Sequence, residues 1–224
     1  MDNITIDIYN KNAAKYADLD IDKVSLKAYH DFSHALPKNG IVLDYGCGPG
    51  YFSKKFLADG FKVDAFDASE KMIEIASIET RVNWWVGDFK SFRATTLYDG
   101  IWANFSLLHS PKRELIPLIQ TIFKSLQPNG LFSLGLKLGI GEKRDKMGRK
   151  YSYFEEKEIR NILSNEGFYH ISHHLGNAKG LDGESANFII IISHALFICL
   201  HGWSLLRKSG PWRMGRPIGC QKPN

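Results

Sequence analysis

The sequence is poor in cysteine, with Cys47, Cys199 and Cys220 in 224 residues, and it contains no Cys-x-x-Cys pair. A disulfide framework is therefore not expected, and a reducing cytoplasm is the expected location. The first twenty residues, MDNITIDIYNKNAAKYADLD, lack both a basic segment and an apolar run, so a secretory signal peptide is not expected there.

A strong charge imbalance is also missing. The 29 basic and 24 acidic residues give a net charge of +5, which is not by itself typical of a nucleic-acid-binding protein. Basic residues gather only at 142–150 and in the last eighteen positions. The 44% hydrophobic content is that of a globular chain, and the length suits one α/β domain with a small appendage.

Apolar runs and helical patterns alternate along most of the chain. Strands are expected at 41–45, 62–67, 82–86, 98–104, 131–138, 169–175 and 187–193, and helices at 22–36, 51–60, 68–77, 111–130 and 155–168. Short connections between alternating strands and helices indicate a mostly parallel, doubly wound sheet. Residues 139–153 read as a long loop, and loops of that length are often lids.

The segment 46–50, GCGPG, joins the first expected strand to a helix. A dinucleotide-binding loop has a third glycine where this chain has Tyr51, so that pattern is incomplete. A P-loop needs Gly-Lys-Ser/Thr, whereas Gly50 is followed by Tyr51 and Phe52, so a nucleoside triphosphate site is excluded. The loop nonetheless allows close approach of another ligand.

Acidic residues stand at the carboxyl ends of three consecutive expected strands. Asp44 lies one position before the end of the first strand, Asp67 ends the second, and Gly87–Asp88 follows the third. A doubly wound sheet binds ligands at this edge. Asp67 can accept hydrogen bonds from both hydroxyls of a ribose, and Asp88 can accept one from an adenine amine while Phe89 offers its backbone N–H.

At this point the sequence resembles the class I methyltransferases that use S-adenosylmethionine (SAM). The matching segments, in the family's order, are VLDYGCGPGYFS, VDAFDASEKMIEIA, VGDF, YDGIWANFSLLHSPK and LQPNGLFSLGLK. The resemblance covers residues 10–193. It implies an α/β Rossmann-like fold, with a doubly wound, mostly parallel seven-stranded sheet whose last strand is antiparallel. It also implies that SAM is converted to S-adenosylhomocysteine (SAH).

The resemblance assigns cofactor contacts residue by residue. Asp44, Gly46, Cys47, Gly48 and Gly50 are expected around the methionine moiety, with Asn104 near its amino group. Asp67 is expected on the ribose, Ala68 and Met72 beside the adenine, and Asp88 and Phe89 on the adenine. Tyr16 matches an N-terminal tyrosine that caps the cofactor's carboxylate in related enzymes. Cys47 has no base nearby in the sequence and is expected to be only a small residue of the loop.

Two further segments, SLLHSPKREL and the Gly-Arg-x-Tyr-x-Tyr-Phe core at 148–154, resemble a group of small bacterial methyltransferases. In that group they are expected to lie over the acceptor. His109, Arg149, Tyr151 and Tyr153 are therefore the candidate acceptor-site residues. His109 is either a general base or a structural histidine, Arg149 either an anion-binding group or a solvated side chain, and the tyrosines could simply pack the lid.

Other patterns restrict the acceptor and the metal content. NFSL at 104–107 differs from the Asp/Asn/Ser-Pro-Pro-aromatic pattern of many amino-methylating enzymes, and no ligand set of a metal-dependent O-methyltransferase is present. His170, His173 and His174 lie on an expected strand without matching ligands, so no metal is expected. A small-molecule acceptor is the leading expectation. An RNA-modifying enzyme and a non-catalytic SAM- or SAH-binding regulator are the alternatives.

The carboxyl-terminal part departs from the family. Residues 188–206 contain no Asp, Glu, Lys or Arg, but a fold of this type needs 187–193 as its last strand, so a membrane helix is not favoured. We expect a methyltransferase domain at 1–194, with an N-terminal helical cap at 1–36, and a basic and apolar extension at 195–224. That extension could contact a partner, a second copy or a membrane surface.

Overall fold

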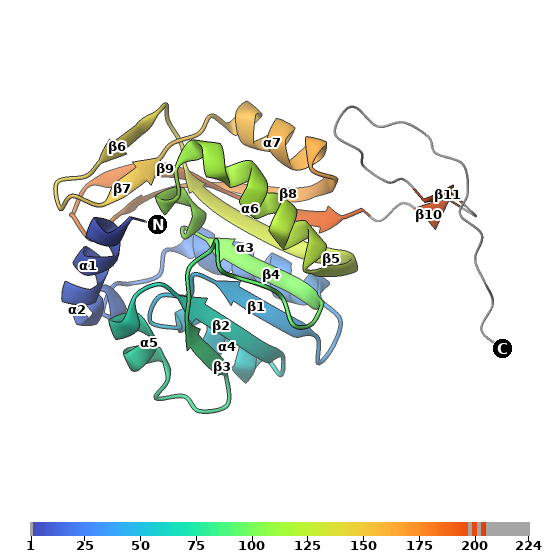
Figure 1. The fold of residues 1–224 in the computed structure, drawn as a ribbon, viewed down its shortest axis with the longest axis horizontal. Coiled ribbons are helices and arrows are strands. Elements are labelled where there is room, and N and C mark those ends of the chain that lie inside the picture. The colour runs from blue at the N-terminus through green and yellow to red at the C-terminus, as the bar shows by residue number, and fades with distance from the viewer. Residues whose placement is uncertain (1, 197–198, 201–202, 205–224) are drawn as a thin grey trace.

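The computed structural model describes residues 2–196, 199–200 and 203–204. Within these residues, a central sheet has the strand order β3-β2-β1-β4-β5-β9-β8. Its strands are β1 (Ile41–Tyr45), β2 (Lys62–Asp67), β3 (Asn83–Val86), β4 (Tyr98–Asn104), β5 (Leu126–Lys137), β8 (Phe168–Lys179) and β9 (Ser185–Ala195). β9 is antiparallel to both of its neighbours, β5 and β8, whereas the four pairs among the first five strands (β2–β3, β1–β2, β1–β4 and β4–β5) are parallel. The sequence prediction of a seven-stranded sheet with an antiparallel last strand is confirmed (Figure 1).

Helices pack on both faces of this sheet. One face is covered by α3 (Lys23–Ala35) and α4 (Tyr51–Ala58), whose Tyr29, Phe32 and Phe56 are fully buried against Trp102 of β4. The other face is covered by α6 (Lys112–Lys124) and α7 (Glu156–Asn165). α5 (Glu70–Ala76) follows β2 and is capped at Ser69, as the sequence predicts. The fold therefore exposes the strand ends, and not the sheet faces, to ligands.

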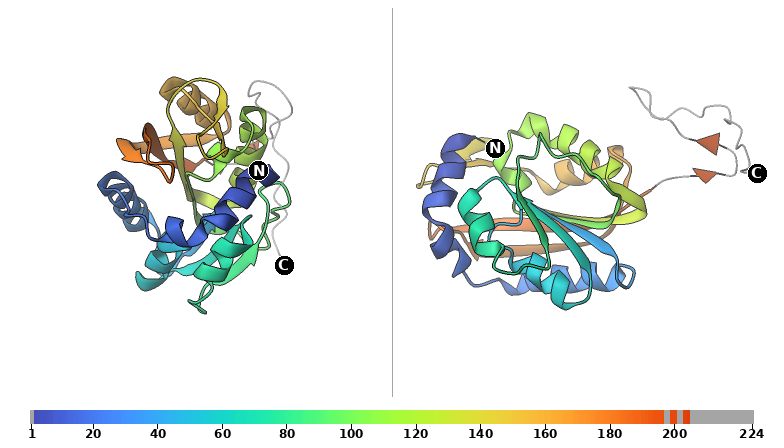
Figure 2. Two further views of the ribbon diagram at one scale, coloured as in Figure 1. Left: turned by 90° about the vertical axis from the view of Figure 1, so that its left-hand side faces the viewer. Right: turned by 60° about the horizontal axis from the view of Figure 1, so that its bottom comes forward.

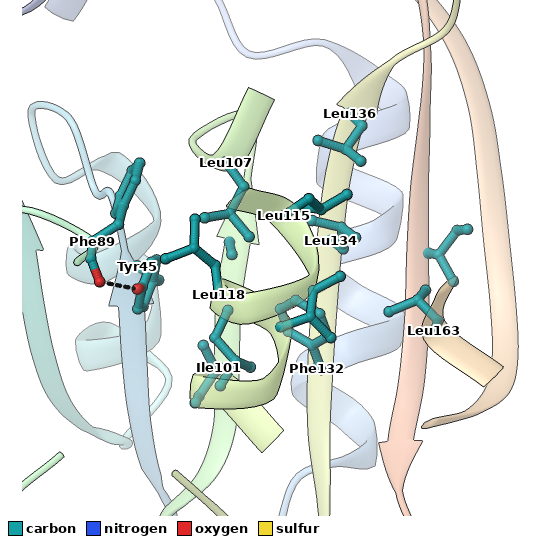
Figure 3. Close-up of a cluster of buried hydrophobic side chains, with 14 of the residues drawn as sticks. Tyr45, Phe89, Ile101, Leu107, Leu115, Leu118, Phe132, Leu134, Leu136 and Leu163 are labelled. Carbon is teal, nitrogen blue, oxygen red and sulfur yellow. Dashed lines mark hydrogen bonds between the residues drawn. The ribbon is translucent and has the colours of Figure 1, made fainter. Parts of the chain in front are cut away.

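The larger core cluster lies between the sheet and the α6–α7 layer. Figure 3 shows Leu115 and Leu118 of α6 and Leu163 of α7 directed at Phe132 and Leu134 of β5. The cluster continues to Tyr45 at the end of β1, whose hydroxyl donates to the carbonyl of Phe89. The core thus extends to the strand ends that precede the candidate ligand site, which fixes their positions.

Several predicted boundaries are wrong, each for an identifiable reason. The helix predicted for 111–130 ends at Lys124, because the next residues already belong to β5. Leu126 of β5 pairs with Tyr98 of β4, and after an irregular stretch the pairing continues from Leu131. Pro117 lies inside α6 and does not end it. β8 extends to Lys179 and not to 175, because it pairs with β9 along the whole hairpin as far as the Lys179–Ser185 pair.

The segment predicted as a loop at 139–153 contains a hairpin. β6 (Glu142–Arg144) pairs with β7 (Lys150–Ser152) around a turn in which Asp145 accepts from the backbone N–H groups of Met147 and Arg149. The hairpin lies beside the N-terminal helix α1 (Asn3–Lys11), and Figure 2 shows the two elements at the same end of the molecule from two further directions. α1 and α2 (Ala13–Ala17) are the first two helices of residues 1–36, the segment that the sequence predicted as an N-terminal helical cap.

The end of the chain is described only in part. The strand predicted at 187–193 is present within β9, and two short strands, β10 (Cys199–Leu200) and β11 (Trp203–Ser204), form a separate hairpin. Most of the extension predicted at 195–224, with its expected membrane or partner contact, lies outside the described residues. Among the helices of the described part, none has the length and apolar character needed to cross a membrane.

Candidate active site

The glycine loop turns sharply between β1 and α4. Gly46, Gly48 and Gly50 all have positive φ, at 83°, 54° and 81°. A Cβ on Gly46 would lie 2.4 Å from Cβ of Ser106, and one on Gly50 would lie 2.5 Å from the Trp84 ring. The backbone of Gly46 and Cys47 is held by N–H donation to the carbonyl of Phe66 at the end of β2. Glycine is required at 46 and 50 by both conformation and space.

Asp67 ends β2 directly below this loop. One of its carboxylate oxygens accepts from the N–H of Gly48 and the other from the N–H of Ser69, each at 2.9 Å. A carboxylate offers about four lone-pair positions, so these two bonds fix its orientation and leave acceptor capacity for a diol. Burial raises the pKa of Asp67, against the opposing effect of these backbone donors.

Asp44 is buried one position before the end of β1. Its Oδ2 accepts from the Ser53 hydroxyl at 2.6 Å, and its side chain has no positively charged partner among the described residues. Burial, opposed by the Ser53 hydrogen bond, raises the pKa of Asp44 to about 7. A ligand ammonium group beside it would supply the missing positive charge.

The residues predicted around an adenine occupy the next two strand ends. Met72 is buried on α5 and Ala68 is half-buried between β2 and that helix. Asp88 follows β3, and one of its carboxylate oxygens accepts from the N–H of Lys90 at 2.7 Å. The Phe89 ring is buried and stacks on Tyr45 at 5.1 Å between ring centroids. This stacking fixes the backbone of the segment that was predicted to read the adenine edge.

Asn104 ends β4 opposite the glycine loop. Its Oδ1 accepts from the Ser133 hydroxyl at 3.0 Å, while its Nδ2 is buried and has no hydrogen-bond partner among the described residues. Leaving an amide donor unpaired in this way is costly, and such groups are uncommon in folded proteins. The unpaired donor therefore suits a ligand oxygen at this strand end.

The N-terminal helices α1 and α2 pack against α5 beside the glycine loop. Tyr16 of α2 lies over Gly48, where an added Cβ would be 3.6 Å from the tyrosine ring. Tyr16 in turn makes an edge contact with Tyr9 of α1 at 5.5 Å. At the other side of α1, Asn10 accepts from the Ser69 hydroxyl at 2.6 Å and from the N–H of Lys71. The cap is therefore attached directly to the residues that surround Asp67.

His109 is buried in a short 3-10 helix, η1 (Leu107–His109), after β4. Its Nδ1 lies 2.7 Å from the carbonyl of Lys150 and its Nε2 lies 2.7 Å from the Tyr9 hydroxyl. A carbonyl only accepts, so Nδ1 carries the proton and Nε2 accepts from Tyr9. Burial lowers the pKa of His109 to about 3, so the ring is neutral at physiological pH.

Arg149 is the most deeply buried charged side chain of this region, at 1% exposure. Its guanidinium lies 2.6 Å from the Asp145 carboxylate and 3.9 Å from that of Asp182, and its Nη1 donates to the Tyr9 hydroxyl at 3.2 Å. The group also lies 5.3 Å from the centroids of both the Tyr9 and Tyr151 rings. Protein carboxylates thus balance its charge, which argues against Arg149 as the anion-binding group for an acceptor.

The structure brings three of the four predicted acceptor-site residues into contact. The His109 and Tyr151 rings are 4.5 Å apart, and Arg149 lies against Tyr151. Tyr153 is half-buried at the edge, 6.2 Å from Tyr151. Four residues of the same cluster had no sequence signal. Tyr9, Lys137 and Asp182 come from distant segments, and Asp145 lies four residues before Arg149 in a segment that the sequence predicted as a loop.

The three histidines of β8 lie away from this site, on the outer strand of the sheet. His174 lies 3.0 Å from Asp31 of α3, and His170 contacts His173 at 5.5 Å. No group of three or more His, Cys, Asp or Glu side chains that could hold a metal ion occurs in the described part of the chain.

Comparison with known proteins decides the family. Residues 13–176 match the family model described as a methyltransferase domain. The chain belongs to the methyltransferase-domain family. The match begins at α2 and runs into β8, so it includes the glycine loop, Asp67, His109 and Arg149, but not Tyr9 or Asp182.

The curated relatives match this chain over only part of their own length. The malonyl-[acyl-carrier protein] O-methyltransferase of Erwinia pyrifoliae is 33% identical over 110 residues, which are 44% of this chain and 42% of that protein. This chain spans between 37% and 42% of the length of the curated relatives it matches.

Solved structures share the fold at low sequence identity. The 1,6-didemethyltoxoflavin-N1-methyltransferase of Burkholderia thailandensis, solved with bound 1,6-didemethyltoxoflavin and SAH, has a TM-score of 0.70 at 18% identity, over 86% of this chain and 88% of that one. The N-methyltransferase NodS of Bradyrhizobium japonicum, solved with SAH, has a TM-score of 0.66 at 17% identity, over 87% and 99%.

Proposed function

We propose that this protein is a SAM-dependent methyltransferase that acts on a small molecule, with SAM bound between the glycine loop and α1–α2. The single observation that carries the proposal is the pair of backbone N–H donors that orient Asp67 beneath Gly48. This arrangement presents a carboxylate with spare acceptor capacity to a ribose at the ligand-binding edge of the sheet. The solved structures that contain SAH support the same cofactor here.

The other predicted cofactor residues fit the remaining groups of SAM. Asp44 lacks a cationic partner and suits the methionine ammonium, while the unpaired Nδ2 of Asn104 suits the methionine carboxylate. We therefore assign Asn104 to the carboxylate and not to the amino group, since an amide N–H donates. Met72, Ala68, Asp88 and Phe89 are assigned to the adenine, and Tyr16 to the cover over Gly46, Cys47, Gly48 and Gly50.

The protein's part in the reaction is positioning. SAM, when bound, supplies an activated methyl group on a sulfonium. The chain's own residues hold the cofactor, aim the acceptor at the methyl carbon and exclude water beneath α1 and the β6–β7 hairpin. We assign the hairpin within 139–153 and the helices within 1–36 to that cover, and residues 1–194 to one domain. The cysteine content favours a cytoplasmic protein.

The proposal is tested by calorimetric titration of the purified protein with SAM, SAH and NAD. Micromolar dissociation constants for SAM and SAH, with no heat from NAD, are expected. Asp67→Ala should weaken SAH binding by about 30-fold or more, because two hydroxyl–carboxylate bonds are lost. Asp31→Ala, which removes an exposed carboxylate on the outer helix α3, is the control and should bind normally. Absence of binding by folded wild-type protein would refute the proposal.

A further inference from the structure

Asn10 of α1 is hydrogen-bonded to the start of α5, next to the end of β2. Its Oδ1 accepts from the Ser69 hydroxyl at 2.6 Å and from the backbone N–H of Lys71 at 3.2 Å. Within the described residues of α1 and α2, the hydrogen bonds to this side of the site all come from Asn10. No sequence pattern indicated this residue, because its two partners follow it by 59 and 61 positions.

Ser69 connects Asn10 to Asp67. Its backbone N–H donates to Oδ1 of Asp67 at 2.9 Å, and its hydroxyl accepts from the N–H of Met72 while it donates to Asn10. Ser69 is 1% exposed, so without Asn10 its hydroxyl would be a buried donor that lacks its acceptor. Because an unpaired buried donor is costly, Ser69 would turn toward another acceptor, and its N–H would shift relative to Asp67.

The two donors that orient Asp67 are held in different ways. Gly48, which donates to Oδ2, belongs to the glycine loop, and that loop is fixed by its own N–H donation to the carbonyl of Phe66. Ser69, which donates to Oδ1, is held from outside the strand–loop unit by Asn10. The orientation of the carboxylate therefore depends on a residue of the N-terminal helices.

α1 is fixed by contacts other than Asn10. The hydroxyl of Thr5 accepts from the N–H of Lys150 at 2.9 Å, and the hydroxyl of Tyr9 lies 2.7 Å from Nε2 of His109. These contacts attach α1 to the β6–β7 hairpin and to η1. Because the helix is anchored there, Asn10 can hold Ser69 in place and does not merely follow its position.

We propose that Asn10 is a positioning residue of the cofactor site, which acts through Ser69 to hold the Asp67 carboxylate in the orientation that accepts the ribose hydroxyls. The inference rests on the proposed methyltransferase function and on the assignment of the ribose to Asp67. Asn10 itself makes no contact with the cofactor. Its effect passes through the hydroxyl and the backbone N–H of one serine.

The test combines a change in the protein with a change in the ligand. Calorimetric titration measures the binding of SAH and of its dideoxyribose form, which lacks both ribose hydroxyls. Asn10→Ala should weaken SAH binding about 10-fold, which is the effect of one hydrogen bond to a charged group. It should weaken the dideoxyribose form by less than about threefold, because that ligand makes no bond to Asp67. A loosened α1 alone would weaken both ligands by the same factor.

Asn12→Ala is the matched control, because it removes the same kind of side chain from the same part of the chain. The Asn12 amide donates to the carbonyl of Ile8 at 2.7 Å, within the N-terminal helices, and does not reach α5. Both ligands should bind to this variant within about twofold of the wild type. Alanine has a higher helix propensity than asparagine, so both alanine variants are expected to fold, which circular dichroism checks.

Asn10→Asp is the conservative variant, since it keeps an oxygen acceptor for Ser69 and Lys71. It should restore most of the SAH affinity that Asn10→Ala loses, together with the preference for SAH over the dideoxyribose form. Unchanged SAH affinity in Asn10→Ala, or equal weakening of both ligands, would overturn the inference. Equal binding of both ligands to the wild type would instead contradict the ribose assignment of Asp67, and absence of SAH binding would contradict the methyltransferase function.

Discussion

The two halves of the candidate active site are built in different ways. The cofactor half consists of the glycine loop, Asp44, Asp67 and the ends of β3 and β4, all of which come from one run of consecutive strands. The acceptor half joins α1, η1, the end of β5, the β6–β7 hairpin and the β8–β9 turn. The first half is organised by backbone geometry, whereas the second depends on hydrogen bonds and ion pairs between side chains of distant segments.

Because of this difference, substitutions in the two halves should affect different properties of the protein. Backbone N–H groups of Gly46, Cys47 and Gly48 hold the cofactor half, so side-chain changes there affect ligand binding more than folding. In the acceptor half, contacts among Tyr9, His109 and Arg149 connect three segments, which are α1, η1 and the β6–β7 hairpin. Substitutions at these three residues should therefore affect stability first.

The largest effect is expected from Arg149→Met. It leaves Asp145, at 6% side-chain exposure, as a buried carboxylate without its partner, which costs about 3–5 kcal/mol of unfolding free energy. Urea denaturation followed by circular dichroism measures this loss. Arg144→Met, which removes a 42% exposed arginine of the same hairpin, should cost less than about 1 kcal/mol. Similar losses for the two variants would show that the buried ion pair does not hold the acceptor half together.

The next effect concerns the glycine loop. Gly46→Ala combines a φ of 83° with a contact of 2.4 Å to Ser106, so the loop must shift, and SAH affinity should fall by more than about 100-fold. Gly60→Ala is the control, because Gly60 has a φ of 92° but no atom within 4 Å of the added Cβ. Calorimetric titration of both variants separates the close contact from the backbone preference. Undiminished SAH binding by Gly46→Ala would show that the loop does not form the cofactor half.

Asp44→Asn should stabilise the protein while weakening the cofactor. The folded-state pKa of Asp44 is about 7 against a usual value of 3.8, so its contribution to stability is full below about pH 4 and is lost as the pH rises through 7. The pKa shift corresponds to at most about 4 kcal/mol of unfolding free energy at pH 8. Because the substitution also weakens the hydrogen bond from Ser53, the unfolding free energy of Asp44→Asn should exceed that of the wild type by only about 2 kcal/mol at pH 8.

Thermal unfolding between pH 4 and pH 9 tests this expectation. The stability of Asp44→Asn should exceed that of the wild type at pH 8 and fall below it at pH 4, where the wild-type carboxyl is neutral and only the weakened Ser53 hydrogen bond distinguishes the two proteins, while SAM affinity falls at every pH above 7. A wild-type advantage that grows with pH would contradict the assignment of a buried, uncompensated carboxylate.

The smallest effect is expected from Tyr9→Phe. It removes the hydroxyl that donates to His109 and accepts from Arg149 but keeps the ring between Tyr16 and His109, so the cost is about 1–2 kcal/mol. SAH affinity should change by less than about threefold. If titration and denaturation show that Tyr9→Phe loses more SAH-binding free energy than unfolding free energy, Tyr9 belongs to the cofactor half.

The cofactor half could be predicted from the sequence because its signals are local. The strands at 41–45, 62–67 and 98–104, the Ser69 cap and the glycine loop are each determined by a few consecutive residues. The acceptor half was predicted only in part: His109, Arg149 and Tyr151 meet, but Tyr9, Lys137 and Asp182 join them through the topology of the fold. Asp145 reaches Arg149 only because 142–152 forms a hairpin, where the sequence predicted a loop.

The most direct test of the account is a crystal structure of the protein with SAH. The account predicts the ribose hydroxyls within hydrogen-bond distance of the Asp67 carboxylate and the SAH sulfur facing the Tyr9–His109–Tyr151 row. SAH bound elsewhere on the molecule, or bound at the glycine loop with its ribose away from Asp67, would contradict it.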